Sequence, residues 1–374
     1  MKIIFICGAL KPGYDGVGDY TRRLSANLII QGVEVAILAL NDQFIAEVIC
    51  QDQTSDGVNI NTCRIPSNWN IIQRINYAKK WIISINPDWL SLQYVPFSFN
   101  SKGLPFNLSK HLSKLTFSKR WHIMFHELWV GMSETASLKH IIWGEIQKKL
   151  IKDLINKIEP NLIHTQTKLY QIQLTKLGFK TKYLPLFSNI TVGSNFKDQH
   201  TFSKKSKIRL VNFGTIHPTV PIEEFAYEAA MYEKKTGTII ELILIGRCGA
   251  EQNKWINVWK SSGLNISVYG EQSSEEIYSI FNSSTFGITT TALSLIEKSG
   301  SVAAMLELNL PVICVSNAWN PRGISDLPKI SGIIEYCIGN FESLMTMSHN
   351  TNISYLGVVK VSEQLKKDIV AASF

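Results

Sequence analysis

A short segment in the second half of the chain has the residue types of a phosphate site. Lys298, Ser299, Gly300 and Ser301 directly precede the apolar run 302–306. Small residues at the start of a helix leave backbone N–H groups open to an anion, and a lysine adds positive charge beside them. The segment predicts a pyrophosphate site, with a capped helix beside a solvated lysine as the structural alternative.

A glycine-rich loop follows the first apolar run and contains Gly13, Gly16 and Gly18. Glycines let the backbone turn sharply and approach a ligand closely. Their spacing is not G-x-G-x-x-G and no acidic residue ends the second strand pattern, which disfavours a dinucleotide-binding domain. A plain glycine turn is the alternative. Asp19, next in the chain, is expected to cap the following helix or to contact an acceptor.

His126 and Glu127 end an apolar strand pattern that begins at residue 122. A side chain at the carboxyl end of a parallel strand can reach a ligand. These two residues are therefore candidate site residues, and a histidine satisfied within the core is the alternative for His126.

Several other chemistries lack their motifs in this sequence. It contains no G-x-S-x-G, H-E-x-x-H or P-loop pattern, and none of its six cysteines forms a C-x-x-C pair. Hydrolase, metalloprotease, NTPase and structural-zinc functions are disfavoured. Most of the cysteines lie in apolar runs, where a thiol behaves as a small hydrophobic group, which is typical of a reducing cytosol.

The elements that must position these residues alternate between strand and helix patterns. Strands are expected at ten apolar runs: 2–8, 33–40, 89–95, 122–127, 162–166, 209–215, 239–246, 265–270, 286–291 and 311–316. Strands that are apolar on both faces are typical of a parallel sheet covered by helices. In the helix expected at 19–30, Tyr20, Leu24 and Leu28 share one face, and Arg22 and Arg23 are expected to point away from it.

A chain of 374 residues has the length of two domains. The strand–helix alternation occurs twice, at 1–188 and 208–374, on either side of a polar linker at 189–207. The helical segment 362–374 is expected to pack back on either domain. The pattern predicts an α/β protein with two Rossmann-like, doubly wound domains whose ligand-binding edges face each other across a cleft.

The net charge of +8 is unevenly distributed along the chain. Residues 1–188 hold 22 Lys and Arg against 13 Asp and Glu, whereas residues 208–374 hold 12 against 16. An anionic partner for the first half is expected, either an acidic substrate or a membrane surface met by Arg22, Arg23, Lys119 and Arg120, and ordinary solvated lysines are the alternative.

The basic residues do not alternate with aromatic residues as on a nucleic-acid surface. No apolar run approaches the length needed to span a bilayer. The expected location is therefore the cytoplasm, with a possible peripheral position at the inner membrane face.

Six segments in this order resemble the retaining glycosyltransferases of GT-B fold, family-4-like: 7–35, 122–129, 210–218, 242–249, 265–271 and 298–313. The resemblance implies a nucleoside diphosphate sugar held by the C-terminal domain, a hydroxyl-bearing acceptor held by the N-terminal domain, and neither a metal nor another cofactor. It implies catalytic roles for Asp19, His126 and Glu127. It implies donor-binding roles for Gly16, Gly18, Thr215, His217, Arg247, Glu271, Glu297, Lys298, Ser299, Gly300, Ser301 and Glu307.

The chain departs from that family's pattern in ways that bear on the donor site. Ile296 and Ala304 stand where the family's E-x7-E glutamates are expected. Glu297 and Glu307 are candidates for displaced substitutes, and solvated surface glutamates are the alternative. The arginine and lysine usual after the first strand of the donor domain are replaced by residues 215–218, so Arg247 and Lys298 must supply the positive charge. Two other functions stay open: a GT-B nucleotide-sugar epimerase, and a catalytically silent homologue that binds a nucleotide sugar or a partner enzyme.

Overall fold

The structure, a computed structural model of the whole chain, describes residues 1–115, 120–190, 207–347, 353 and 355–373. It divides into two compact units. The first unit comprises Met1–Asn189, Pro321–Gly323 and Gly357–Phe374, and the second comprises Ile190–Asn320 and Ile324–Leu356. Most of the expected linker, 189–207, lies outside the described residues.

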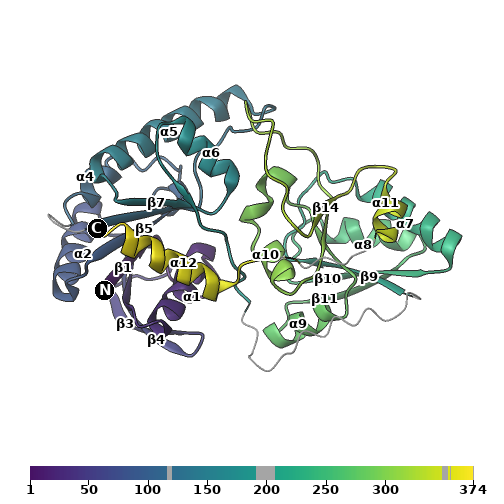
Figure 1. The fold of residues 1–374 in the computed structure, drawn as a ribbon, viewed down its shortest axis with the longest axis horizontal. Coiled ribbons are helices and arrows are strands. Elements are labelled where there is room, and N and C mark those ends of the chain that lie inside the picture. The colour runs from purple at the N-terminus through teal and green to yellow at the C-terminus, as the bar shows by residue number, and fades with distance from the viewer. Residues whose placement is uncertain (116–119, 191–206, 348–352, 354, 374) are drawn as a thin grey trace. The chain divides into compact units, whose positions relative to one another are not determined.

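The first unit contains an eight-stranded sheet in the order β3-β4-β2-β1-β5-β6-β7-β8 (Figure 1). Its strands are β1 (Lys2–Cys7), β2 (Glu34–Asp42), β3 (Ile49–Ser55), β4 (Val58–Pro66), β5 (Trp89–Tyr94), β6 (Arg120–Phe125), β7 (Leu162–Thr165) and β8 (Lys182–Tyr183). All neighbours are parallel except β3 and β4. The five strands expected in this half are confirmed, and the β3–β4 hairpin and β8 are additional.

Helices connect these strands, as a parallel sheet requires. They are α1 (Gly16–Ile30), α2 (Ile71–Ile85), α3 (Pro96–Phe99), α4 (Leu108–Leu112), α5 (Leu138–Ile158), α6 (Lys168–Lys176) and α12 (Val358–Ala371). The last helix, α12, returns to the first unit and packs on α1. Gln31 at the end of α1 donates to the Ser362 hydroxyl at 2.6 Å, and Lys366 donates to the Gln31 carbonyl at 2.7 Å.

Two expectations for α1 were wrong. Asp15, and not Asp19, caps the helix: its Oδ1 accepts from the Gly18 amide at 2.7 Å. Arg22 does not point to solvent, because its guanidinium donates to the Leu10 carbonyl at 2.8 Å and pairs with Asp19. Arg23 likewise turns back and pairs with Asp56 at 3.1 Å. Hydrogen bonds to carbonyl and carboxylate acceptors thus hold both arginine side chains away from the solvent-facing direction that the helical pattern predicts.

The second unit has a six-stranded parallel sheet in the order β11-β10-β9-β12-β13-β14. Its strands are β9 (Lys207–Phe213), β10 (Ile239–Ile245), β11 (Asn265–Gly270), β12 (Phe286–Thr289), β13 (Val312–Cys314) and β14 (Ile333–Glu335). Its helices are α7 (Ile222–Thr236), α8 (Gln252–Ser261), α9 (Ser274–Asn282), the 3₁₀ helix η1 (Leu293–Lys298), α10 (Gly300–Glu307) and α11 (Phe341–Thr346). The five strands expected here are confirmed.

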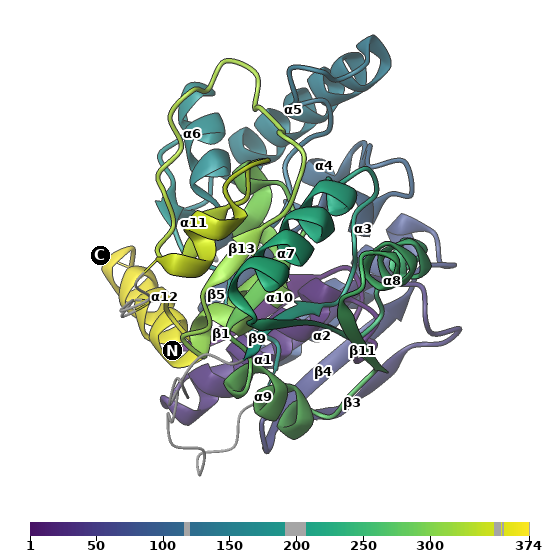
Figure 2. The ribbon, with the colours of Figure 1, turned by 90° about the vertical axis from the view of Figure 1, so that its right-hand side faces the viewer.

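Successive residues of β10 serve opposite faces of this sheet. Leu242 and Leu244 belong to one apolar core, and Ile243 and Ile245 belong to the other. Both faces are therefore buried, which is why the strand is a continuous apolar run. On one face α7 and α11 lie side by side (Figure 1 and Figure 2), and the Glu228 carboxylate accepts from the Tyr336 hydroxyl at 2.6 Å in the loop before α11.

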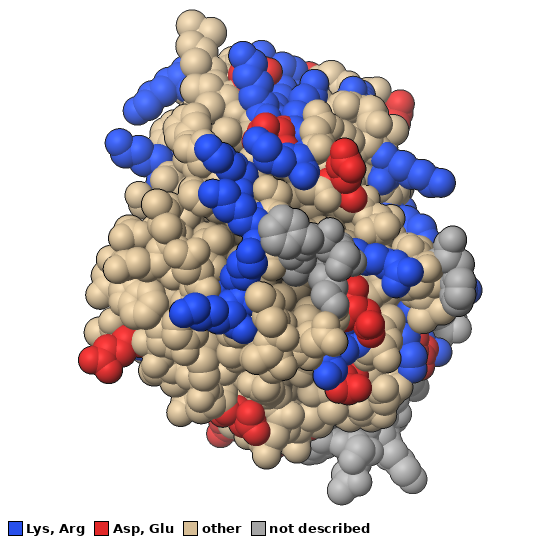
Figure 3. All heavy atoms as spheres, turned by 90° about the vertical axis from the view of Figure 1, so that its left-hand side faces the viewer, with Lys and Arg blue, Asp and Glu red and all other residues tan. Residues whose placement is uncertain are grey.

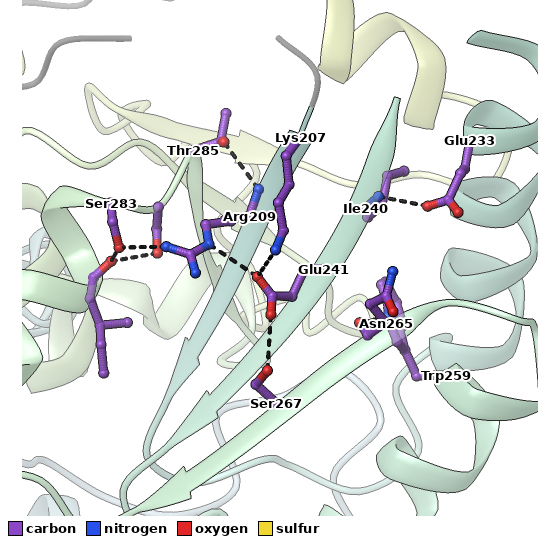
Figure 4. Close-up of polar contacts among 12 residues, drawn as sticks. Lys207, Arg209, Glu233, Ile240, Glu241, Trp259, Asn265, Ser267, Ser283 and Thr285 are labelled. Carbon is purple, nitrogen blue, oxygen red and sulfur yellow. Dashed lines mark hydrogen bonds and ion pairs between the residues drawn. The ribbon is translucent and has the colours of Figure 1, made fainter. Parts of the chain in front are cut away.

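One charged cluster joins the three strands at one edge of the sheet (Figure 4). Glu241 on β10 is 2.9 Å from Lys207 and 3.0 Å from Arg209, both on β9, and accepts from Ser267 on β11 at 2.9 Å. Burial by itself raises the pKa of Glu241, but hydrogen bonds from these three residues outweigh it, and the pKa is lowered. The cluster therefore fixes strand register through an ionised carboxylate.

Candidate functional site

The start of α10 has the geometry of an anion-binding helix terminus. Ser299 is the N-cap, and its hydroxyl accepts from the Val302 amide at 3.3 Å and lies 3.0 Å from the Ser301 hydroxyl. Within the described residues, the amides of Gly300 and Ser301 have no protein acceptor. A Cβ at Gly300 would meet no atom within 4 Å. The helix start is therefore open on the side of a Gly300 Cβ, and the two amides lie at the positive end of the helix.

Charged residues flank this helix start. Lys298 and Glu297 end the 3₁₀ helix η1, immediately before the cap, and Glu307 ends α10. Tyr355 lies within electrostatic reach of both glutamates: burial raises the pKa of its hydroxyl, and the negative charges of Glu307 and Glu297 raise it further. The two glutamates thus share one neighbour although ten positions separate them.

The two positions expected to hold the family's glutamates are buried in the core. Ile296 is 1% exposed and Ala304 is 2% exposed, and both pack in the same apolar cluster. A carboxylate at either position would need a polar partner, since an unpaired buried charge is strongly unfavourable. In this chain the acidic groups therefore stand beside those positions and not at them.

Thr215 and His217 lie in the loop that follows β9. The His217 amide donates to the Thr290 hydroxyl at 2.8 Å, and its Nδ1 is 3.0 Å from the same oxygen. Thr290 follows β12, the neighbour of β9 in the sheet. Its hydroxyl is also 3.5 Å from the Thr215 carbonyl. These contacts join the loops after two adjacent strands at the edge where parallel α/β sheets bind ligands.

Arg247 follows β10, and Glu271 follows β11. Their side chains form an ion pair at 2.9 Å, and both are about two-thirds exposed, at 68% and 66%. The hydrogen bond from Arg247 is the main cause of the lowered pKa of Glu271. The positive charge expected from Arg247 is thus partly balanced by a neighbouring carboxylate.

His126 lies in the first unit, directly after β6, and is 3% exposed. Its Nε2 is 2.9 Å from the Gln93 side-chain oxygen, and its Nδ1 is 2.9 Å from the Gln166 side-chain oxygen. The Tyr20 ring packs edge-on against the imidazole, with 4.8 Å between the two ring centroids. The imidazole is held on three sides, which fixes its orientation. The Glu127 amide is 3.4 Å from the Tyr94 carbonyl.

The glycines of the glycine-rich loop differ in the space beside them. A Cβ at Gly18 would lie 2.6 Å from the Ala9 carbonyl oxygen, so this glycine permits close packing of helix and loop. Gly16 has open space in the same direction. Asp19 accepts from the Gly13 amide at 3.1 Å, which ties the loop to the first turn of α1. Gly13 and Gly16 thus have open space beside them, and Gly18 does not.

The expected basic surface does not include Arg22, which is buried, or Arg23, whose side chain is 12% exposed. Arg120 donates to the Ser373 carbonyl at 2.9 Å, and Lys119 lies outside the described residues. Lys and Arg nevertheless outnumber Asp and Glu on the face drawn in Figure 3. Exposed lysines occur along α5, at Lys139, Lys149, Lys152 and Lys157. The anionic membrane surface and the cytoplasmic location remain predictions.

No helix in the described part of the chain is long and apolar enough to cross a membrane. Among the same residues, no group of three or more His, Cys, Asp or Glu side chains is placed to hold a metal ion. That the protein needs no metal remains a prediction.

Comparison with known proteins gives matches at the level of three-dimensional structure. No family model matches the chain, and no curated protein matches it in sequence. The lipopolysaccharide outer core galactosyltransferase WaaB, in its apo form, superposes with a TM-score of 0.57 at 15% identity over 99% of both chains. HepE from Anabaena, solved with UDP and glucose, gives a TM-score of 0.58 at 13% identity over 99% of this chain and 100% of that one.

The chain has the GT-B fold. A UDP-GlcNAc 2-epimerase from Neisseria meningitidis, bound to UDP-GlcNAc, is similar to the same extent, with a TM-score of 0.58 at 11% identity over 99% and 100% of the two chains. GT-B proteins similar to this chain thus include both glycosyltransferases and epimerases, and at these identities the likeness establishes the fold.

The site residues predicted from sequence fall into two groups. Thr215, His217, Arg247, Glu271, Glu297, Lys298, Ser299, Gly300, Ser301 and Glu307 belong to the second unit, and Gly16, Gly18, Asp19, His126 and Glu127 belong to the first. Sequence reasoning missed Thr290, Gln93 and Gln166, which orient two of the predicted histidines. A threonine or glutamine at the end of a strand pattern was the available signal.

Proposed function

We propose that this protein is a glycosyltransferase that moves a sugar from a nucleoside diphosphate sugar to a hydroxyl acceptor with retention of configuration. The observation that carries the proposal is the start of α10, where two backbone amides without a protein acceptor follow Lys298. A pyrophosphate develops negative charge as it leaves the sugar, and preorganised N–H groups and a cation stabilise that charge.

The proposed donor is a uridine diphosphate sugar. HepE, of the same fold, was solved with UDP and glucose, and the epimerase was solved with UDP-GlcNAc. In this proposal Gly300, Ser301 and Lys298 bind the diphosphate. His126 contacts the donor sugar or its phosphate. Glu127 and Asp19, which belong to the same unit as His126, have catalytic roles. The retaining outcome follows from the family resemblance of the sequence.

A nucleotide-sugar epimerase is the second candidate, favoured by the similarity to UDP-GlcNAc 2-epimerases at TM-scores of 0.58 to 0.60. The two functions differ in the fate of the diphosphate. A transferase given donor alone releases UDP slowly by transfer to water, whereas an epimerase changes the sugar and can keep the nucleotide attached. A silent homologue binds the donor and leaves it unchanged.

The test uses Lys298→Ala and calorimetry with UDP. Loss of one charge-assisted contact is worth about 1 to 3 kcal/mol, so UDP affinity is expected to fall roughly 5- to 150-fold. The control is Lys254→Ala, which removes a lysine on α8 that pairs with Glu223. Equal UDP affinity of the folded Lys298→Ala variant and the parent would contradict the phosphate site.

The reaction class is read from product analysis with a panel of uridine diphosphate sugars. UDP release that increases when a hydroxyl acceptor is added supports transfer, and a changed sugar still attached to UDP supports epimerisation. Tight binding with neither product, over all donors and acceptors tried, would refute both enzymatic functions.

A further inference from the structure

A continuous series of buried polar side chains joins His126 to the last helix of the chain. All of its members belong to the first unit: Gln93 and Ser91 on β5, His122 on β6, His164 on β7 and Asp368 on α12. Each is less than 7% exposed. Removing this many polar groups from water is unfavourable unless each one is paired, so the pairing is informative.

The half nearest α12 consists of two histidines and a carboxylate. Asp368 Oδ2 is 3.0 Å from His164 Nε2, and His164 Nδ1 is 3.1 Å from His122 Nε2. Asp368 also accepts from Lys182 at 2.6 Å and from Gln364 at 2.9 Å. Burial by itself raises the pKa of Asp368, but hydrogen bonds from His164, Gln364 and Lys182 lower it by more. The pKa is therefore lowered overall, and the carboxylate is ionised.

The half nearest the candidate site continues without a gap. His122 Nδ1 is 2.8 Å from the Ser91 hydroxyl, which accepts from the Gln93 side-chain amide at 2.8 Å. The oxygen of that same amide is 2.9 Å from His126 Nε2. Four side chains thus connect the imidazole of His126 to the carboxylate of Asp368, which is 242 positions later in the chain.

The direction of every hydrogen in this series follows from one end, the Asp368 carboxylate. A carboxylate only accepts, so His164 carries its hydrogen on Nε2 and accepts at Nδ1. His122 must then donate from Nε2 and accept the Ser91 hydroxyl at Nδ1. Burial lowers the pKa of both His122 and His164, which keeps these two rings neutral with one hydrogen each. The Gln93 amide donates to Ser91, and its oxygen requires a hydrogen on His126 Nε2.

We propose that Asp368 is a positioning residue that, through this series of hydrogen bonds, holds His126 in the form with hydrogen on Nε2. Its relevance to catalysis rests on the proposed function, in which His126 meets the donor. The side chain opposite, Gln166, then presents its amide nitrogen to His126 Nδ1, because a ring whose single hydrogen is on Nε2 accepts at Nδ1 and the two ends of a glutamine amide exchange by rotation.

The substitution Asp368→Asn reverses the series. Lys182 only donates and holds the oxygen of the new amide, so the amide nitrogen faces His164 Nε2 and donates to it. His164 and His122 must then carry hydrogen on Nδ1, and Ser91 donates to a rotated Gln93 side chain. The amide nitrogen of Gln93 then donates to His126 Nε2, and the hydrogen of His126 moves to Nδ1.

The experiment records the ring-nitrogen resonances of the full-length protein with ¹⁵N-labelled histidine. In the parent, His126, His122 and His164 are expected to carry hydrogen on Nε2, and in Asp368→Asn all three are expected to move toward the Nδ1 form. Gln31→Ala is the control, because it removes the Gln31 side-chain contact between α1 and α12 and leaves the series intact. Retention of the Nε2 hydrogen on His126 in folded Asp368→Asn would overturn the proposal.

A second variant keeps the test decisive if Asp368→Asn does not fold. Ser91→Ala interrupts the series midway, so His164 is expected to stay in the Nε2 form while His126 loses its single form. An unchanged His126 in Ser91→Ala would also overturn the proposal. These resonances need no substrate and no turnover, so their outcome is separate from the outcome of the transferase assay.

Discussion

A carboxylate introduced at Gly300 should affect folding and ligand binding in opposite directions. Gly300 is the first residue of α10, is exposed, and has no atom within 4 Å of a Cβ added there, so Gly300→Asp fits without a clash. An acidic residue in the first turn of a helix stabilises it by about 0.3 to 1 kcal/mol. Replacing glycine adds roughly 0.4 to 1 kcal/mol through the unfolded state. The melting temperature is therefore expected to rise by a few degrees.

Diphosphate binding should weaken in the same variant. Two unit charges about 5 Å apart repel each other by about 1 kcal/mol in water and about 3 kcal/mol at the effective dielectric constant near a protein surface. A carboxylate beside the bound diphosphate should thus reduce UDP affinity by about 1 to 3 kcal/mol, which is roughly 5- to 150-fold. Damage to the fold would instead lower the melting temperature and the affinity together.

The assay pairs a thermal melt without ligand with calorimetry in the presence of UDP. Ser274→Asp is the matched control, since Ser274 is the first residue of α9 in the same unit and the change adds the same charge at the same helical position. That control should bind UDP as the parent does. If Gly300→Asp binds UDP within about twofold of the parent, the start of α10 does not hold the diphosphate.

Three further outcomes are expected. Glu241→Gln should destabilise the second unit by about 1 to 3 kcal/mol in urea unfolding at pH 7. Glu342→Gln, which removes the exposed ion pair between Glu342 and Lys235, should not. Because the pKa of Glu241 is lowered on folding, its contribution is present above the unfolded-state pKa and should disappear as the pH falls through the lower folded-state pKa. Gly18→Ala should lower the melting temperature through its clash with a backbone carbonyl, at a cost of about 1 to 3 kcal/mol, and Gly16→Ala should not. His126→Ala should slow UDP release from the donor by about 100-fold, measured as diphosphate produced without acceptor.

Ten strands could be predicted because each is a mostly apolar run, whereas β4, β8 and β14, which also pair in parallel, were not predicted. The run at 239–245 is buried on both faces of the sheet. The β3–β4 hairpin could not be found this way, since β3 is polar and mostly accessible. Its turn did leave a signal: Asp56 and Gly57 both have positive φ, and Asp-Gly is a common pair in two-residue hairpin turns.

The candidate site was predictable where local sequence determines local structure. The small residues before the apolar run 302–306 are indeed a capped helix start. The side chains that orient His126 come from other strands, 33 and 40 positions away, and no periodicity relates them to it. Arg22 shows the same limit, because its acceptor is a carbonyl in the preceding loop. Such partners are determined by the tertiary fold and not by the pattern of one element.

The return of α12 to the first unit has a consequence for how the protein is made. During synthesis the second unit, together with Pro321–Gly323 of the first, separates α12 from Met1–Asn189. At 5 to 20 residues per second this stretch takes on the order of 10 to 30 s to appear. Until then α1 lacks the helix that packs on it, and His164 lacks its carboxylate. A chain that ends before α12 would therefore leave the apolar surface that α12 covers on the first unit, and His164, open to solvent.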